Sequence, residues 1–403
     1  MTESARQRIL HCIDSGGLYG AETMLVQLAA RQIQAGLTVN ICSLGVAGDT
    51  PKAIEQYCYD HHIPVTPLSV PAGFSLKASQ RFMQFIEAYQ PQVVHTHGYK
   101  PNVLLALQSL KQRSLRRLSK PQALPRVVST LHGWVAPALW SKVGVYEYID
   151  RWALTTSDAV AVVASQMLRQ LPTSAIRRKA QVVVNGIQAQ LPADSFSSRK
   201  ALCPLLKLRP AQYPDWDQAR LLCAVGRLST EKQLDKLIHA FALLKQASSA
   251  PCYLLIIGDG PERIALQQLS QALSLGHSVI FAGFQSDAYR FLPVMDLLIM
   301  TSATEGMPMT VLEAMRAGIA IATTAVGELP AVLQPAGEPA AGWLFANDEP
   351  DTIATDLYRL IEQPAHLRQL GQTAHQRFLK HYTADQMLHQ YQSLYNYPSQ
   401  AAA

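Results

Sequence analysis

The sequence predicts an α/β protein made of two doubly wound, Rossmann-like domains, each built on a parallel sheet. Short apolar runs alternate with helical stretches along the chain in two successive series. The runs lack the polar alternation of half-exposed strands, so they fit strands that are buried on both faces. A chain of 403 residues is also long enough for about two to three domains.

The two series define the strands that we expect in each domain. They span residues 8–13, 38–44, 92–97, 126–131, 159–164 and 181–184, then 220–226, 253–258, 278–283, 296–301 and 319–324. Alternation of strands and helices implies right-handed crossovers between parallel strands. We therefore expect two sheets that face each other across a cleft, with ligands at the carboxyl ends of the strands.

A proline-rich stretch separates the two series. Residues 188–218 contain four prolines, which predicts a linker and a poorly ordered loop. The expected boundaries are 1–190 for an N-terminal domain, 191–218 for the linker and 219–379 for a C-terminal domain.

The composition excludes several classes of protein. Hydrophobic residues make up 48% and charged residues 16% of the chain, which argues against intrinsic disorder. No apolar run reaches the roughly 18 residues of a membrane-spanning helix, and the first residues lack the apolar core of a signal peptide. The six cysteines are far apart and form no C-x-x-C pair, so we expect a cytoplasmic protein without disulfides or structural zinc.

Positive charge gathers in the first half of the chain. Residues 1–200 carry 21 Lys and Arg against 11 Asp and Glu, whereas residues 201–403 carry 14 against 18. Within the first half, Leu107–Lys120 combines five basic residues with leucines near helical spacing. Such a helix either lies on an anionic membrane surface or is a solvated domain helix, and the sequence favours neither.

The most informative segment is EGMPMTVLE, which follows the fourth predicted strand of the second series. Pro308 suits the first turn of a helix, and that helix should end at Gly318. Amides of the first turn would form an anion site at the end of the strand. Glu305 on the loop and Glu313 in the helix could bind hydroxyl groups beside it, although a loop glutamate and an exposed helix glutamate are equally common.

Two cations follow the first strand of the second series, in the sequence GRLSTEK. Arg227 and Lys232 there could neutralise a diphosphate, Arg with its planar fork and Lys as a point charge. Taken alone, such a pair is more often a solvated helix start.

Two glycine-rich loops differ from a dinucleotide-binding loop. Gly16 and Gly17 lie between the first strand and a helical run, but Ser15 occupies the first glycine position of G-x-G-x-x-G. The loop Gly258–Arg263 lacks the third glycine, and no acidic residue ends the second strand. A nicotinamide-dependent enzyme is therefore not expected, and GDGP fits an ordinary turn.

Three histidines end two strands of the first series. His95 and His97 are spaced by two, so they point to one face and could bind a metal, but no third ligand is evident nearby. We therefore expect no metal. His132 is better placed as a hydrogen-bonding or acid/base group near a substrate, all three lying at the mouth of the cleft.

Taken together, these motifs resemble retaining glycosyltransferases of family 4, which have the two-domain GT-B architecture. The resemblance covers about residues 8–395 and is most specific at GRLSTEK and EGMPMTVLEAMRAG. Shorter matches are GGLYGAE, VVHTHG, TLHG, VVNGI, IGDGP and FAGF, all in the family's order. It implies transfer of a sugar from a nucleotide-sugar donor to a glycan or lipid-linked acceptor, without a cofactor or an obligatory metal.

The resemblance also assigns roles to residues of the second domain. Arg227 and Lys232 would hold the diphosphate, Glu313 the ribose hydroxyls, and Glu305 the donor sugar. The full donor-binding set that it implies is Gly16, Gly17, Arg227, Lys232, Glu305, Gly306, Met307, Pro308, Met309, Thr310 and Glu313.

In the first domain, the resemblance places His132 near the reacting sugar, so His132 joins Arg227, Lys232 and Glu305 as a catalytic candidate. Tyr19 and His97 are candidates for contact with the acceptor. The last helix, about residues 380–397, would pack back on the first domain.

The sequence departs from the family pattern at three positions. Gln233 stands where a glycine usually follows the lysine, Gln188 where an acidic residue is common, and Thr23 where a basic residue is frequent. The first and third put the geometry of the phosphate loops in doubt. None removes a proposed catalytic group.

The acceptor and the course of the reaction are left open by the sequence. A basic first domain favours a lipid-linked or acidic glycan of the cell envelope, reached at the inner face of the plasma membrane. Three other functions are compatible: a sugar-nucleotide epimerase, a non-catalytic glycan-binding or nucleotide-binding relative, and an RNA-binding protein. The last lacks any RNP-type aromatic motif, so no nucleic acid is expected.

Overall fold

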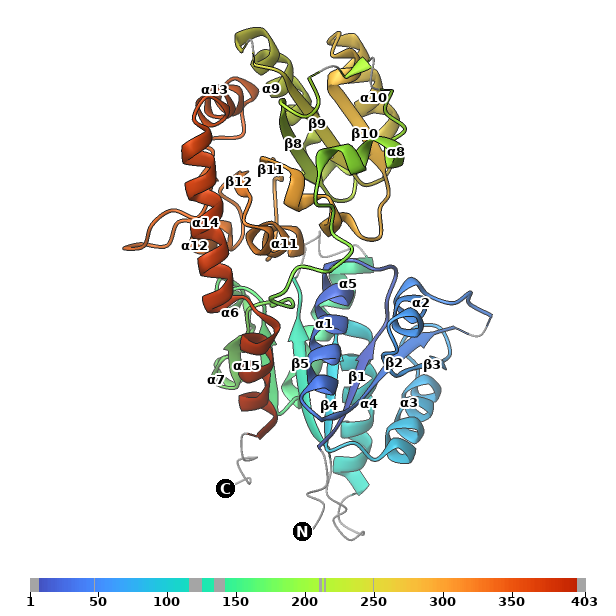
Figure 1. The fold of residues 1–403 in the computed structure, drawn as a ribbon. Coiled ribbons are helices and arrows are strands. Elements are labelled where there is room, and N and C mark those ends of the chain that lie inside the picture. Colours follow the sequence, from blue (N-terminus) through green and yellow to red (C-terminus); the bar gives the residue numbers. More distant parts are fainter. Residues whose placement is uncertain are drawn as a thin grey trace. The chain divides into compact units, whose positions relative to one another are not determined.

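The computed structural model describes residues 7–46, 48–115, 125–133, 142–209, 212–213, 215–248 and 250–396. The chain forms two compact units, one of residues 1–188 with residues 384–403 and one of residues 189–383. Each unit contains one parallel sheet with helices packed against it (Figure 1). The prediction of an α/β protein with two Rossmann-like domains is confirmed.

The first unit has a seven-stranded sheet in the order β3-β2-β1-β4-β5-β6-β7. Its strands are β1 (Arg8–Ile13), β2 (Thr38–Gly45), β3 (Val65–Ser69), β4 (Val93–His97), β5 (Arg126–Leu131), β6 (Ala159–Val162) and β7 (Ala180–Val182). All pairs are parallel, and the order reverses between β1 and β4. The carboxyl ends of β1, β4 and β5 therefore meet at this reversal, where ligands bind in doubly wound sheets.

Helices cover both faces of this sheet. They are α1 (Gly20–Gln34), α2 (Ala53–Asp60), α3 (Leu76–Tyr89), α4 (Tyr99–Leu115), α5 (Lys142–Ala153), α6 (Met167–Gln170), α7 (Ser174–Arg178) and α15 (Ala384–Asn396). Leu10 and Phe82 belong to the core between the sheet and α3, and Ile13 and Leu25 to the core beside α1. Helix α15 lies beside α1 although more than 300 residues separate them (Figure 1).

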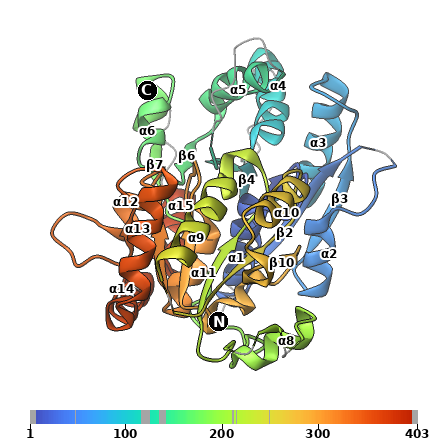
Figure 2. The ribbon, with the colours of Figure 1, turned by 90° about the horizontal axis from the view of Figure 1, so that it is seen from above.

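The second unit has a six-stranded sheet in the order β10-β9-β8-β11-β12-β13. Its strands are β8 (Arg220–Val225), β9 (Cys252–Ile257), β10 (Val279–Gly283), β11 (Leu297–Met300), β12 (Ala320–Thr323) and β13 (Trp343–Leu344). Its helices are α8 (Leu202–Leu205), α9 (Leu234–Ala247), α10 (Arg263–Ala272), α11 (Met309–Ala317), α12 (Leu329–Leu333), α13 (Pro350–Ile361) and α14 (Pro364–His381). Helices α9 and α13 pack together (Figure 2).

The prediction for residues 188–218 is wrong in one respect. These residues were expected to form a poorly ordered linker, yet several of them are packed on the second unit. The Arg199 guanidinium binds the Asp296 carboxylate at 2.7 Å and the Ala219 carbonyl oxygen at 2.5 Å. The Trp216 ring is 4% exposed, and its Nε1–H donates to the Arg199 carbonyl oxygen. These described residues are therefore held on the second unit, and Pro204 lies within the short helix α8.

Among the described residues, no helix is both long enough and apolar enough to cross a lipid bilayer.

Candidate functional site

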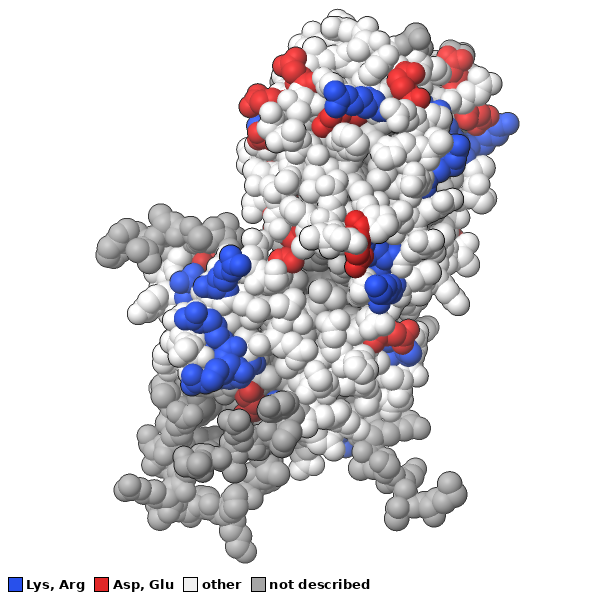
Figure 3. All heavy atoms as spheres, turned by 90° about the vertical axis from the view of Figure 1, so that its left-hand side faces the viewer, with Lys and Arg blue, Asp and Glu red and all other residues white. Residues whose placement is uncertain are grey.

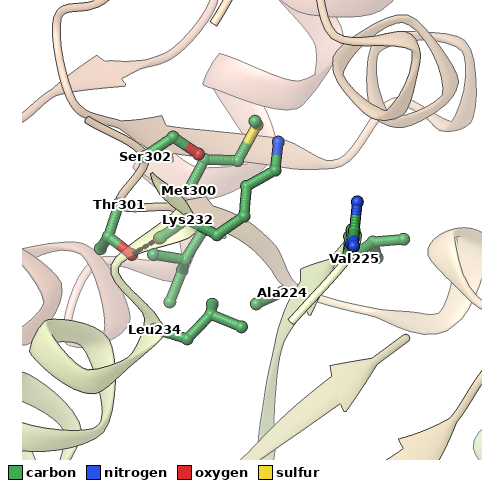
Figure 4. A pocket seen from close by; sticks show the side chains of 10 residues that line it. Ala224, Val225, Lys232, Leu234, Met300, Thr301 and Ser302 are labelled. Carbon is green, nitrogen blue, oxygen red and sulfur yellow. Dashed lines mark hydrogen bonds between the residues drawn. The ribbon is translucent and has the colours of Figure 1, made fainter. Parts of the chain in front are cut away.

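The loops that follow β8 and β11 lie together at one edge of the second sheet, because these two strands are neighbours. They line a pocket made by Ala224, Val225, Gly226, Arg227, Lys232, Leu234, Ile299, Met300, Thr301 and Ser302. Figure 4 shows the Lys232 side chain extending along this pocket, while Thr301 holds the backbone of its turn. The structure thus brings the two most specific motifs of the sequence to one place.

Lys232 and Glu305 form an ion pair at the centre of this edge. The Lys232 Nζ lies 2.6 Å from the Glu305 Oε1, and the Ser302 hydroxyl donates to the same oxygen at 2.7 Å. The Glu305 side chain is 10% exposed and that of Lys232 25%. One carboxylate oxygen therefore fixes the ammonium group, and the ammonium protons that Glu305 does not use can reach an anion. Arg227 lines the same pocket and is exposed.

The turn that carries Lys232 is held by hydrogen bonds from Thr301, which follows β11. The Thr301 hydroxyl bonds the carbonyl oxygens of Lys232 and Gln233, both at 3.0 Å. Gln233 has a left-handed backbone, with φ of 48°, a conformation that glycine adopts at least cost. Gln233 nevertheless adopts it, and the two Thr301 hydrogen bonds hold the turn in place. The left-handed conformation costs about 1 kcal/mol of backbone strain.

Close backbone contacts, which the sequence did not reveal, shape the loops around the pocket. A Cβ on Gly258 would lie 1.8 Å from the Gly226 carbonyl oxygen, and one on Gly327 would lie 2.2 Å from that of Glu305. Both positions also have positive φ. The glycine of the GDGP turn therefore lets β9 approach the GRLSTEK loop, which goes beyond simple turn geometry. Gly327, in the loop after β12, supports the loop that holds Glu305.

Helix α11 ends as predicted and begins directly after Pro308, which was expected in its first turn. Pro308 is its N-cap, and Gly318 closes it in the left-handed conformation with φ of 69°. The side chains of Met307 and Met309 are each 7% exposed. Their side chains therefore pack inside the second unit. Gly306, Pro308 and Thr310 are partly buried on the same turn.

Glu313 lies one turn into α11 and is only partly exposed. Burial raises the pKa of its carboxyl group to about 7, although the nearby Arg316 guanidinium acts in the opposite direction. Among the described residues, none donates a hydrogen bond to this carboxylate. A desolvated carboxylate without an internal donor is suited to bind hydroxyl groups of a ligand. The alternative of an exposed helix glutamate is wrong.

The glycine-rich loop of the first unit joins β1 to α1. Gly16 has open space where a Cβ would lie, whereas a Cβ on Gly17 would meet the Tyr19 ring at 2.5 Å. The Tyr19 amide donates to the Glu22 carboxylate at 3.1 Å, which caps the first turn of α1. Tyr19 is 57% exposed. Its ring is therefore available to a ligand, and Glu22 is occupied by the cap.

The histidines at the carboxyl edge of the first sheet are less accessible than expected. His95 and His97 were predicted at the mouth of a cleft, but they are 0% and 2% exposed. His97 therefore cannot contact an acceptor directly in this structure. His132, after β5, is partly exposed, and burial lowers its pKa to about 4. It is neutral at physiological pH.

Sequence reasoning missed His11, which stands beside this pair. The register of β1 on β4 places His11 opposite His95, and the ligand atoms of His11, His95 and His97 lie within 4.8 Å of one another. His11 lies inside a strand rather than at its end. Only the pairing of β1 with β4, which a single sequence does not reveal, could have identified it.

Basic side chains gather on one face of the first unit, as Figure 3 shows. Among the exposed basic residues of this unit are Arg169 on α6 and Arg177 and Arg178 on α7. The other basic segment of the sequence, Leu107–Lys120, lies largely outside the described residues: its backbone is described as part of α4 up to Leu115, and its basic side chains are not.

Known protein families account for both units. The model of Glycosyltransferase Family 4 matches residues 19–191. The model of Glycosyl transferases group 1 matches residues 210–377. The chain belongs to the family 4, group 1 glycosyltransferases. The motifs at the two sheet edges are therefore those of a glycosyltransferase.

Relatives match this glycosyltransferase over most of its length. It is 24% identical to N-acetyl-α-D-glucosaminyl L-malate synthase of Bacillus anthracis, over 95% of each chain. It is 23% identical to the O-antigen biosynthesis glycosyltransferase WclY of Escherichia coli, over 75% of this chain and 78% of WclY.

Solved structures confirm the GT-B fold. Anabaena HepE, crystallised with UDP and glucose, superposes with a TM-score of 0.74 at 19% identity, over 96% of this chain and 99% of HepE. Sucrose-phosphate synthase of Thermosynechococcus elongatus superposes with a TM-score of 0.72 at 19% identity, over 97% and 98% of the two chains.

Proposed function

We propose that this glycosyltransferase moves a sugar from a nucleotide-sugar donor to a glycan or lipid-linked acceptor, with retention of configuration at the anomeric carbon. The observation that carries the proposal is the carboxylate of Glu313. It is desolvated, its pKa is raised to about 7, and none of the described residues donates to it. Two adjacent hydroxyl groups of a ribose would supply the missing donors.

The donor diphosphate fits the cations of the same edge. Arg227 and Lys232 would bind it, together with amides of the first turn of α11. These fixed positive groups would stabilise the charge that develops on the leaving nucleoside diphosphate, so we propose that no divalent metal is required. The uridine nucleotide and glucose bound to HepE support a donor of this class.

Retention would follow from attack on the face that the leaving group occupies. The bond between the anomeric carbon and the diphosphate oxygen breaks, and the acceptor oxygen forms the new bond on the same side. The acceptor hydroxyl proton passes to an oxygen of the leaving diphosphate. Glu305, held by Lys232 and Ser302, would orient the sugar hydroxyls during this step.

The acceptor is proposed to belong to cell-envelope or secreted polysaccharide synthesis at the cytoplasmic face of a membrane. The names of the E. coli O-antigen enzyme and the Rhizobium meliloti lipopolysaccharide core enzyme LpsE support this class. The exposed arginines of α6 and α7 would attract anionic lipids, a contact that salt screens.

A transfer assay tests this proposal. Purified full-length protein is incubated with radiolabelled UDP-, GDP-, ADP- and dTDP-sugars, with and without anionic vesicles that contain lipid-linked glycan acceptors. We expect one donor class to label the acceptor with retained configuration by NMR, and more slowly at high salt. Conversion of the donor without an acceptor would instead identify an epimerase. Absence of both reactions would contradict the enzymatic function.

A further inference from the structure

A continuous row of hydrogen-bonded polar side chains runs through the core of the first unit. It begins at the partly exposed His132 and ends on β5, two residues before that histidine. Its members come from three neighbouring strands and two helices, in the order His132, His97, His11, Gln32, Tyr395, His95 and Thr130. All members except His132 are buried.

Three contacts form the first half of the row. The Nε2 of His132 lies 3.3 Å from the Nδ1 of His97. The Nε2 of His97 lies 3.1 Å from the Nδ1 of His11. The Nε2 of His11 lies 2.8 Å from the Oε1 of Gln32 on α1. Each inner imidazole thus uses both of its ring nitrogens within the row.

The second half passes through the C-terminal helix. The Nε2 of Gln32 donates to the hydroxyl oxygen of Tyr395 on α15 at 3.1 Å. That hydroxyl lies 2.8 Å from the Nδ1 of His95, and the Nε2 of His95 lies 2.7 Å from the Thr130 hydroxyl. Helix α15 is therefore joined to the same row as His132.

The imidazoles are neutral. Burial lowers the pKa of His11 and of His132 to about 4, and it lowers the pKa values of His95 and His97 well below the ordinary range. A neutral imidazole has one N–H donor and one acceptor nitrogen, so each histidine must donate at one contact and accept at the other.

This requirement fixes which nitrogen donates and which accepts at each contact along the row. The Gln32 carbonyl oxygen accepts from His11, so His11 carries its hydrogen on Nε2 and accepts at Nδ1. His97 must then donate from Nε2 and accept at Nδ1, and His132 must donate from Nε2. Among the described residues, none bonds the Nδ1 of His132, which keeps its lone pair.

A metal ion is a poorer explanation of the three clustered histidines. Both ring nitrogens of His11, His95 and His97 already bond side chains of the protein. A metal would break at least one bond at each ring and leave a buried donor or acceptor unpaired, which is unfavourable. In the row, every ring nitrogen of His11, His95 and His97 has a hydrogen-bond partner.

We propose that this row fixes the tautomer of His132, so that its Nδ1 accepts a hydrogen bond from a substrate hydroxyl. The inference rests on the proposed function, because it assumes that a sugar lies near His132. Gln32, His11, His97 and Tyr395 are then positioning residues. If one histidine alone moved its hydrogen to the other ring nitrogen, two donors would face each other at one contact and two acceptors at the other. The direction of the row can therefore change only if the Gln32 amide turns over and every member changes its hydrogen bonds together.

Two tyrosines of α15 provide a matched pair of variants. Tyr395 is 3% exposed and its hydroxyl lies inside the row, whereas Tyr391 is 1% exposed and its hydroxyl bonds only the end of the row, at the Thr130 hydroxyl. The Tyr391 ring also packs against His95, a contact that phenylalanine keeps. Tyr395→Phe removes the acceptor that orients the Gln32 amide, and Tyr391→Phe removes a hydroxyl of similar burial. We expect a mixture of His132 tautomers and about tenfold lower kcat in Tyr395→Phe, with little change in KM. Tyr391→Phe should keep the single tautomer and wild-type kcat.

The readout is the ring-nitrogen NMR spectrum of 15N-histidine-labelled full-length protein at pH 7, with the His132 signals assigned from the His132→Gln variant. The wild type should show His132 as a single neutral form protonated on Nε2. Protonation on Nδ1, a mixture in the wild type, or equal spectra of the two tyrosine variants would overturn the inference. Since no substrate is present, this result is independent of whether the protein transfers sugar.

Discussion

Replacing Lys232 by alanine should lower the turnover of sugar transfer by at least about 100-fold, and Glu305→Ala should do the same. Lys232 would stabilise charge on the leaving diphosphate, an interaction that strengthens in the transition state. Glu305 both orients the sugar and holds the Lys232 ammonium at 2.6 Å. Steady-state rates of the purified variants, with the donor saturating, measure the effect.

The two residues should also act as one unit. Since Lys232 and Glu305 contact each other, the fold-decrease in turnover of the double variant should be far smaller than the product of the two single fold-decreases. Lys200→Ala is a suitable control, because Lys200 is 81% exposed and pairs with Asp217 before the start of β8, at the opposite edge of the sheet. Near-normal turnover of either single variant, or strictly multiplicative losses, would remove these assignments.

Replacing Glu313 by glutamine should stabilise the second unit at pH 8 and not at pH 5. The pKa of the carboxyl is about 7 in the folded protein, above its ordinary value of 4.5. The folded state therefore binds the proton more tightly, and the wild type loses stability as the pH rises through this interval. At pH 8 the ionised, desolvated carboxylate costs about 3 kcal/mol, which glutamine avoids.

Thermal unfolding at a series of pH values tests this expectation. A gain of about 3 kcal/mol corresponds to a rise of roughly 6–12 °C in the midpoint of the affected unit. Glu362→Gln serves as the control, because Glu362 is exposed at the end of α13 and bonds Ser248 beyond the end of α9. The same gain at pH 5 and pH 8, or a loss at pH 8, would show that Glu313 is not desolvated.

The sequence predicted the buried strands well because they read as continuous apolar runs. It missed two strands of the sheets. Strand β3 contains Pro67 and is partly exposed throughout, so its composition resembles a loop. Strand β13 has two residues, too few to give any pattern. The end of α11 was predicted correctly because Gly318 provides the left-handed residue that closes a helix.

The site of the second unit could be found from local motifs, because each follows a strand and neighbouring strands end at one edge. The row in the first unit could not be found in this way. His11 belongs to it only through the pairing of β1 with β4, and Tyr395 only because α15 returns to the first unit. Such contacts depend on tertiary structure, which a single sequence encodes without local signals.

The most direct test of the account is calorimetric binding of UDP, GDP, ADP and dTDP to the full-length wild type and to Glu313→Ala, with and without magnesium. The account predicts that one nucleotide binds, that its affinity does not depend on magnesium, and that Glu313→Ala weakens it at least about tenfold because charged hydrogen bonds to the ribose are lost. Equal affinity in the variant, or binding that requires magnesium, would contradict a donor site built on Glu313, Arg227 and Lys232.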